Sequence, residues 1–376
     1  MTKLDELINR LCPDGVEYRK IKNVFSRLKG TPITAGKMKE IANDNGEIKI
    51  FAGGKTEINA RLSDIPNANI ISVPAVLVQS RGVIDVIYYD KPFTFKNEMW
   101  AYTHNNETTV KYLYYVLKKS IEKFREAAKG MGSLPQISLP VTEEFFIPVP
   151  PLEVQAEIVR ILDSFTELTA ELTAELTARK KQYEYYRNFL LTFDLEVNTV
   201  PLAEIAEIST GSSNTNEGLE EGIYPFYVRS QEPLRKNEYE FDETAIITAG
   251  DGVGVGKVFH YVVGKYALHQ RAYRIHITSP KVLPRYYFHY MRNTFLPYIQ
   301  KTLFHGSVAS IRRPMLNKFP VPVPPIEEQR RIVDILDRFE KLCNDISDGL
   351  PAEIEARQKQ YEYYRDKLLT FKELQK

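Results

Sequence analysis

A glycine-rich stretch, AGDGVGVGKV at Ala249–Val258, has the composition of a nucleotide-binding loop. A phosphate-binding P-loop would need glycine where Asp251 stands and Ser or Thr where Val258 stands. A dinucleotide-binding loop would lead into a helix, whereas the residues after this stretch read as a strand. The stretch therefore predicts the turn of a β-hairpin rather than a nucleotide site.

Other catalytic or metal-binding arrangements are missing from the sequence. The histidines show no paired metal spacing, and no nucleophile stands beside a base. Cys12 and Cys343 are the only cysteines, which excludes a disulfide framework and a Cys-rich metal site. We expect no catalytic residues, no metal and no cofactor in this chain.

Residue types suited to DNA gather around two glycine-containing turns, QSRG at Gln79–Gly82 and AGDGVG at Ala249–Gly254. Arg, Gln and Asn form bidentate contacts to base edges, whereas Lys and Arg also suit phosphates. For any single residue the alternative is a solvated surface side chain. The candidate DNA-binding residues are Lys55, Gln79, Ser80, Arg81, Gly82, Lys96, Asn97, Ser133, Asp251, Gly252, Lys257, Gln270, Arg271, Arg274, Ser307, Arg312 and Arg313.

The charge distribution supports a polyanionic partner. The net charge of the chain is +1, but the stretch from Ala245 to Pro325 holds eleven Lys or Arg and a single acid, Asp251. Local charge decides binding to a polyanion, because salt screens interactions beyond about 10 Å at 0.1 M.

Two long helices are expected to position these turns, and they carry a repeated sequence. RKKQYEYYRNFLLTF at Arg179–Phe193 recurs as RQKQYEYYRDKLLTF at Arg357–Phe371, with twelve of fifteen positions identical. PVPPLEVQAEIVRILDSF at Pro148–Phe165 recurs as PVPPIEEQRRIVDILDRF at Pro322–Phe339, with twelve of eighteen identical. Each helix should start after its Pro-Pro pair, and Gly349-Leu350-Pro351 should kink or break the second one.

The first helix contains two TAEL tetrads, Thr169–Leu172 and Thr173–Leu176. Four residues turn a helix by about 400°, so each tetrad moves the apolar stripe by only about 40°. Because this drift is small, tetrads could be gained or lost without hiding Leu172 and Leu176. The alternative interpretation is that the tetrads are low-complexity helical filler.

Length and composition fit two ordinary domains. The chain has 376 residues, of which 43% are hydrophobic and 26% charged. No apolar run approaches the roughly 18 residues that span a bilayer, and the N-terminus does not resemble a signal peptide. We expect a cytoplasmic protein.

With these motifs, the sequence resembles the DNA specificity subunit of type I restriction–modification systems. The resemblance covers essentially the whole chain and rests on the PVPP blocks, the QYEYYR pair and the TAEL tetrads. It implies an α+β fold with a pseudo-two-fold internal repeat, in which two α/β target-recognition domains are separated by two long antiparallel coiled-coil helices. The boundaries are then 1–150 for the first domain, 151–195 for the first helix, 196–325 for the second domain and 326–376 for the second helix.

The resemblance also implies what the chain does. Each domain would read one half of a split, asymmetric site in double-stranded DNA. The helices would set the unread spacer and dock two methyltransferase subunits, with restriction and translocase subunits joining them. S-adenosylmethionine, ATP and Mg would be bound by the partner subunits. The residues expected to bind partners are Leu172, Leu176, Tyr183, Tyr186, Ile354, Tyr361 and Tyr364.

Two other functions are possible on sequence alone. A structural coiled-coil adaptor without DNA specificity would share the helices but not the basic, acid-poor stretch. A self-sufficient methyltransferase would need an Asn-Pro-Pro-aromatic loop, whereas the Pro-Pro pairs here are followed by Leu152 and Ile326. We therefore expect a non-catalytic subunit that reads DNA.

Overall fold

The chain forms two compact units in a computed structural model that describes residues 2–54, 56–128, 134–194, 196–302, 310–345 and 347–375. Unit 1 comprises Met1–Leu172 and Ile354–Lys376, and unit 2 comprises Thr173–Glu353. Unit 2 is therefore one continuous stretch of chain, whereas unit 1 is assembled from two separate stretches. In the first helix of the repeat, the boundary lies between the two TAEL tetrads.

Unit 1 is built around a four-stranded antiparallel sheet. In chain order, its elements before the long helix are α1 (Lys3–Leu11), β1 (Tyr18–Lys20), β2 (Ser26–Leu28), α2 (Ala35–Ile41), β3 (Ile48–Phe51), β4 (Glu57–Ala60), β5 (Ala75–Gln79), β6 (Asp85–Tyr89), β7 (Phe93–Phe95), β8 (Trp100–Thr103), α3 (Glu107–Lys119), α4 (Ile121–Ala127), α5 (Leu139–Glu143) and β9 (Phe146–Pro148). The central sheet has the order β2-β8-β5-β6, and a smaller sheet has the order β4-β3-β7. Helix α3 packs on β5 and β6, so the apolar run AVLVQ of β5 is buried throughout.

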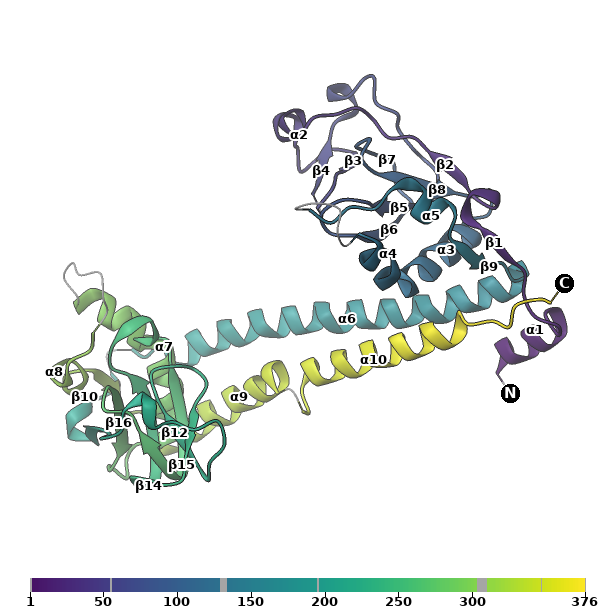
Figure 1. The fold of residues 1–376 in the computed structure, drawn as a ribbon. Coiled ribbons are helices and arrows are strands. Elements are labelled where there is room, and N and C mark those ends of the chain that lie inside the picture. Colours follow the sequence, from purple (N-terminus) through teal and green to yellow (C-terminus); the bar gives the residue numbers. More distant parts are fainter. Residues whose placement is uncertain are drawn as a thin grey trace. The chain divides into compact units, whose positions relative to one another are not determined.

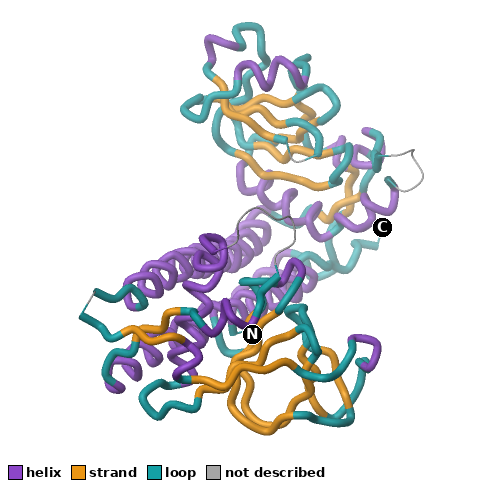
Figure 2. Tube along the Cα trace, turned by 90° about the vertical axis from the view of Figure 1, so that its left-hand side faces the viewer, coloured by secondary structure: helices purple, strands orange, loops and turns teal. Residues whose placement is uncertain are grey.

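Unit 2 has a larger sheet of six strands. Its elements are β10 (Thr199–Pro201), β11 (Ala206–Thr210), β12 (Tyr224–Tyr227), β13 (Leu234–Lys236), β14 (Phe241–Ala249), β15 (Phe259–Leu268), β16 (Ala272–Ile277), α7 (Pro284–Thr302), α8 (Arg313–Asn317), β17 (Pro320–Pro322) and α9 (Ile326–Asn344). The sheet has the order β11-β16-β14-β15-β12-β13 and is strongly curved (Figure 2). Helix α7 packs on β14 and β15, as α3 does on β5 and β6.

The long helices are α6 (Leu152–Leu190) and α10 (Leu350–Leu368), together with α9. Helix α6 begins after Pro151 and runs unbroken for 39 residues, about 58 Å at 1.5 Å per residue. The predicted interruption of the second helix is confirmed, since α9 ends at Asn344 and α10 begins at Leu350. Between them, the Asp345 carboxylate accepts hydrogen bonds from the Ser347 and Asp348 backbone N–H groups at 2.8 and 3.2 Å.

The repeated helices pair reciprocally. In unit 1, the first half of α6 lies antiparallel to α10 (Figure 1). There Phe165 stacks on Tyr364, with ring centroids 5.4 Å apart. In unit 2, the second half of α6 lies antiparallel to α9 (Figure 1). There Phe339 stacks on Tyr186, with ring centroids 5.6 Å apart. Each unit thus combines the PVPP helix of its own half with the QYEYYR helix of the other half. This exchange explains why the chain carries both segments twice.

Helix α1 and the C-terminal tail are found only in unit 1. Helix α1 is tied to α6 by ion pairs from Lys3 to Glu157 (2.9 Å) and from Arg10 to Glu153 (2.8 Å). Val154 is buried there, whereas its counterpart in the second repeat is Glu328, which pairs with Arg331 on α9. The tail is held at Val16 through backbone bonds to residues 372 and 374. Among the described residues, no helix has the length and apolar character needed to cross a membrane.

Candidate nucleic-acid interface

The turn after β5 forms a fixed loop in unit 1, here called tip loop 1 (Ser80–Val83). Gly82 adopts a φ of +79°, which favours glycine. The Gly82 N–H donates to the Pro135 carbonyl at 2.8 Å, and the Ile137 N–H donates to the Ser80 carbonyl at 2.9 Å. The Ser80 hydroxyl also donates to the carbonyl of Glu98. Bonds from two other segments therefore hold this loop in one conformation.

Unit 2 repeats the arrangement after β14, in tip loop 2 (Gly250–Val253). Gly252 has a φ of +78°. The Ile311 N–H donates to the Gly250 carbonyl at 2.8 Å, and the Gly250 N–H donates to the Arg271 carbonyl at 2.9 Å. The bridge between Arg81 and Gln136 in unit 1 has its counterpart between Asp251 and Ser310 in unit 2. The two tip loops are the same backbone device with different side chains.

The side chains on the tip loops differ in charge. Arg81 is exposed, and no ion pair to it is found among the described residues. Asp251 accepts hydrogen bonds from Arg229 at 2.6 Å and from Arg271 at 3.2 Å. Partial burial raises the pKa of Asp251, but the two arginines outweigh it and hold that pKa below its usual value. Tip loop 1 thus presents a cation, whereas the anion of tip loop 2 is committed to two neighbouring cations.

A second turn lies beside each tip loop. In unit 1 it carries Lys96, which pairs with Glu98 at 3.0 Å, and the exposed Asn97. Asn97 also lines a groove of about 490 Å³ together with Arg27 and Trp100. In unit 2 the corresponding turn carries the exposed Gln270 and Arg271. Both turns bring amide and cationic side chains next to the tip loop. Arg27 and Trp100, which line the groove in unit 1, were not among the residues selected from the sequence.

Two of the candidates in unit 1 are buried. Gln79 is the last residue of β5, and its side chain is enclosed, as is that of Ser80. We correct the expectation that these side chains contact DNA, because both are enclosed in the fold and the Ser80 hydroxyl is used to hold tip loop 1.

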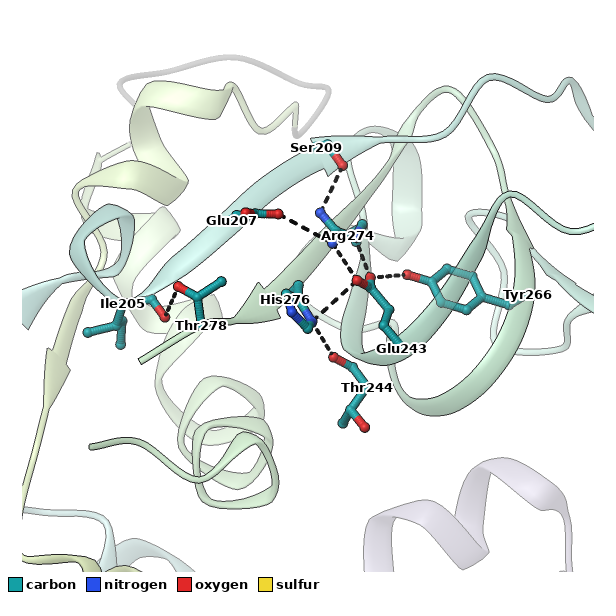
Figure 3. Close-up of polar contacts among 9 residues, drawn as sticks. All are labelled: Ile205, Glu207, Ser209, Glu243, Thr244, Tyr266, Arg274, His276 and Thr278. Atoms are coloured by element: carbon teal, nitrogen blue, oxygen red, sulfur yellow. Dashed lines mark hydrogen bonds and ion pairs between the residues drawn. The ribbon is translucent and has the colours of Figure 1, made fainter. Parts of the chain in front are cut away.

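Arg274 also differs from the expectation of a phosphate contact. Its guanidinium is buried and makes two hydrogen bonds to the Glu243 carboxylate, and it lies 3.6 Å from Glu207 (Figure 3). Tyr266 donates to Glu243 at 2.9 Å, and His276 lies 3.3 Å from Glu243 (Figure 3). Burial raises the pKa of Glu243, but the bond from Arg274 outweighs it, and the net shift is downward. Arg274 therefore joins strands of the sheet and is not available to a phosphate.

The remaining candidates are exposed or lie outside the described residues. Lys257 comes after tip loop 2, and Arg312 and Arg313 stand at the start of α8, close in sequence to the segment that holds this loop. Lys55, Ser133 and Ser307 lie outside the described residues.

The tyrosines of the repeated helix divide between two faces. Tyr183 and Tyr361 belong to the apolar cores of units 2 and 1, and Tyr186 and Tyr364 stack on phenylalanines. Leu172, Leu176 and Ile354 are half-buried. The tyrosines most open to a partner are Tyr185 and Tyr363, which are 65% and 62% exposed and are not among the residues named above as partner-binding. The signal was available, because residues 183, 186 and 190 share one helical stripe and residue 185 lies off it.

One cluster has the residue types of a metal site. His289, Asp337 and Glu340 have ligand atoms within 4.8 Å of one another. Arg285 already pairs with both carboxylates at 2.8 Å, and Arg292 also pairs with Glu340. In unit 1 the equivalent Asp163 is bound by Lys111 and Tyr115. The cluster therefore serves to pack α7 on α9, as its counterpart packs α3 on α6.

The internal duplication of the fold is matched by a family model that covers the chain twice. The chain belongs to the family of the type I restriction modification DNA specificity domain, which matches residues 13–179 and 195–356. As a member of this family, the chain is a specificity subunit and not a catalytic one.

Individual relatives agree with this assignment. The chain is 35% identical over 361 residues to the specificity subunit of the type I restriction enzyme EcoR124I/EcoR124II from Escherichia coli, covering 88% of each chain. A putative type I specificity subunit from Mycoplasma pneumoniae is 33% identical over 242 residues, covering 60% of this chain and 92% of that one. The fold matches the crystal structure of a type I restriction–modification S subunit from M. genitalium, with a TM-score of 0.67, 17% identity and coverage of 94% of this chain and 96% of that one.

Proposed function

We propose that this chain reads a bipartite, asymmetric site in double-stranded DNA, with one half-site per unit. The observation that carries the proposal is the pair of tip loops, which share a backbone frame and differ in their side chains. Identical loops would suit a symmetric site, whereas Arg81 in one and Asp251 in the other favour different base pairs.

The exposed side chains around each loop have the chemistry for this task. Arg81 has the fork that binds guanine O6 and N7, and Asn97 and Gln270 have amides that pair with adenine N6 and N7. Arg312 and Arg313 suit phosphates, which fix position without reading sequence.

We also propose that the long helices position methyltransferase subunits at two copies per chain, with restriction subunits joining the complex. Tyr185 and Tyr363 support this, because the same aromatic side chain is exposed at the same place in both copies of a repeated helix. S-adenosylmethionine, ATP and Mg would then be bound by those partners, in the cytoplasm. A solved structure of similar fold comes from work on complex assembly and conformational transition of the type I R-M system.

Exchange of one unit's variable block tests the proposal. Residues 13–147 are replaced by the corresponding block of a relative, and the methylated bases in cells carrying the complex are sequenced. We expect one half of the methylated site to change and the other half to stay. A change in both halves, or in neither, would contradict the proposal.

The isolated chain provides a second test. It should neither methylate nor cut DNA when it is supplied with labelled S-adenosylmethionine, ATP and Mg. Activity should appear when methyltransferase subunits are added, and clear turnover by the chain alone would contradict the proposal.

A further inference from the structure

Val253, in tip loop 2, is the most exposed large apolar side chain among the described residues. Its exposed fraction is 95%, whereas its counterpart Val83 in tip loop 1 is 38% exposed. Both valines come directly after a glycine of nearly equal positive φ, +78° and +79°. Single exposed apolar residues are common on protein surfaces, so exposure alone implies no ligand. The surroundings of Val253 add the further observations.

The backbone fixes the direction of Val253. On one side, Gly252 needs its positive φ. On the other side, a Cβ added to Gly254 would lie 2.5 Å from the Arg229 carbonyl oxygen. The backbone at Gly254 is therefore packed directly against the backbone at Arg229. Valine is also stiff at χ1. The loop therefore presents two methyl groups at a fixed place, with little rotamer freedom to lose on contact.

The loop around Val253 is suited to a DNA groove. Val253 lies in the loop that joins β14 and β15, which pair antiparallel in the middle of the six-stranded sheet. The glycines of this loop carry no Cβ, which allows a close approach to a groove. Arg229 and Arg271 stand beside the loop, tied to Asp251 at 2.6 and 3.2 Å. Since two cations outnumber the one anion, the loop can approach phosphates. An open recess of about 390 Å³ lies between Arg229, Ser230 and Val253.

Resting on the proposed function, we infer that Val253 reads a thymine by packing against its 5-methyl group in the major groove. The thymine methyl is the apolar group on the major-groove edges of the four bases, whose other features are hydrogen-bond donors and acceptors. An aliphatic tip without a donor or acceptor matches that group. Asp251, whose carboxylate is held by two arginines, leaves the tip itself apolar.

The test uses the full chain assembled with its methyltransferase subunits and a duplex carrying the methylated target. Each thymine of the target is replaced in turn by deoxyuridine, which lacks only the methyl group, and the affinity is measured by competition. One replacement should lower affinity about fourfold, the effect of losing one buried methyl. Val253→Ala should lower affinity for the unmodified duplex by a similar factor and should abolish the response to that replacement.

Val263 provides the matched control, because it is 73% exposed in the same unit but lies on β15. Val263→Ala should keep both the affinity and the deoxyuridine response of the unchanged chain. The inference is overturned if the complex binds its target but tolerates every deoxyuridine, or if Val253→Ala retains the response. Failure to prefer the target over unrelated DNA would instead count against the proposed function.

Discussion

The two tip loops share a similar backbone conformation and an equivalent backbone hydrogen bond, but they differ in their exposed side chains. In both units, one glycine of positive φ and bonds from two distant segments fix the loop. The residue before that glycine is Arg81 in unit 1 and Asp251 in unit 2. The valine after it is 38% exposed in unit 1 and 95% exposed in unit 2. Since the backbone bonds do not depend on these side chains, the exposed residues can change without loss of the loop.

The packing of the recognition domains on the helices obeys the same principle. Asp163 binds Lys111 and Tyr115, and the equivalent Asp337 binds Arg285 and His289. The aspartate is the same in both copies of the repeated helix, whereas the residues that bind it differ between the units. Val154 is apolar and buried on the part of α6 that α1 covers, whereas its counterpart Glu328, which has no such cover, is charged. The differences between the units thus depend on the segment that packs against each position.

The largest effect is expected from the length of α6. Deleting Thr169–Leu172 shortens the helix by about 6 Å and rotates its C-terminal half by about 40°, close to the roughly 34–36° between neighbouring base pairs. The complex should assemble, keep both half-sites and shorten the unread spacer, by one base pair. Sequencing of the methylated bases measures the spacer, and an unchanged spacer would contradict this prediction.

Deleting one residue there is the matched control. It turns the apolar stripe by about 100° and should prevent both units from keeping their helix pairs. No methylated site should then be detected, and normal assembly of this variant would show that the helix does not set the register.

Removing the cation of tip loop 1 should have the next largest effect. Arg81→Gln should weaken binding to the target by about 1–3 kcal/mol, the usual worth of one bidentate base contact. Arg81→Lys keeps the charge but loses the fork, so it should keep the salt dependence and still lose discrimination at one base pair. If the unchanged chain, Arg81→Gln and Arg81→Lys all show the same preference for the target over mismatched duplexes, Arg81 does not read a base.

The exposed tyrosines test whether the two partner sites are equal. Tyr185 stacks on the exposed Phe189, whereas the residue at the corresponding position after Tyr363 is Lys367. Tyr185→Ala should therefore weaken one methyltransferase site by about 2 kcal/mol, and Tyr363→Ala should weaken the other by about 1 kcal/mol. Mass measurements at dilute concentration report the stoichiometry, and Tyr239→Ala in unit 2 serves as the exposed control. Equal losses would show that Phe189 contributes nothing.

Asp251→Asn should reduce discrimination by tip loop 2. It frees Arg229 and Arg271 from their shared anion, so affinity for unrelated DNA should rise a few-fold. The slope of log affinity against log salt should also steepen by about one. Target affinity should change less than affinity for unrelated DNA. An unchanged salt slope would show that the two arginines do not approach phosphates.

The smallest effect concerns acid and α1. A hydrogen bond from Arg160, helped by one from Lys3, lowers the pKa of Glu157 from 4.5 to about 2. A depressed folded-state pKa gives stability that is present above pH 4.5 and is lost as the pH falls towards 2. The protection of the α1 amides, which is their exchange rate relative to the intrinsic rate at each pH, should therefore fall over that range, and Glu157→Gln should remove this fall. Identical profiles for both chains would contradict this prediction.

Sequence patterns predicted the long helices, their interruption and the hairpin turns, because these arise from local propensity and from the repeat. The reciprocal pairing of Phe165 with Tyr364 was not predicted, since a repeat does not say which copy packs on which. Gln79 and Arg274 have suitable chemistry but point into the fold, and residue type alone cannot reveal this. Helical phase would have favoured Tyr185 over Tyr183 as the exposed member. The docking of α1 had no recognised signal.

The discontinuity of unit 1 has a consequence for folding during synthesis. All of unit 2 lies between Thr173 and Glu353, so it can fold as soon as that stretch has been made. Unit 1 needs Ile354 and the residues after it, and Phe165 must wait for Tyr364. At roughly 5–20 residues per second, the wait lasts on the order of 10–40 s. The first recognition domain to be synthesised is therefore the last to complete its core, and during that interval it exposes apolar surface to chaperones or to aggregation.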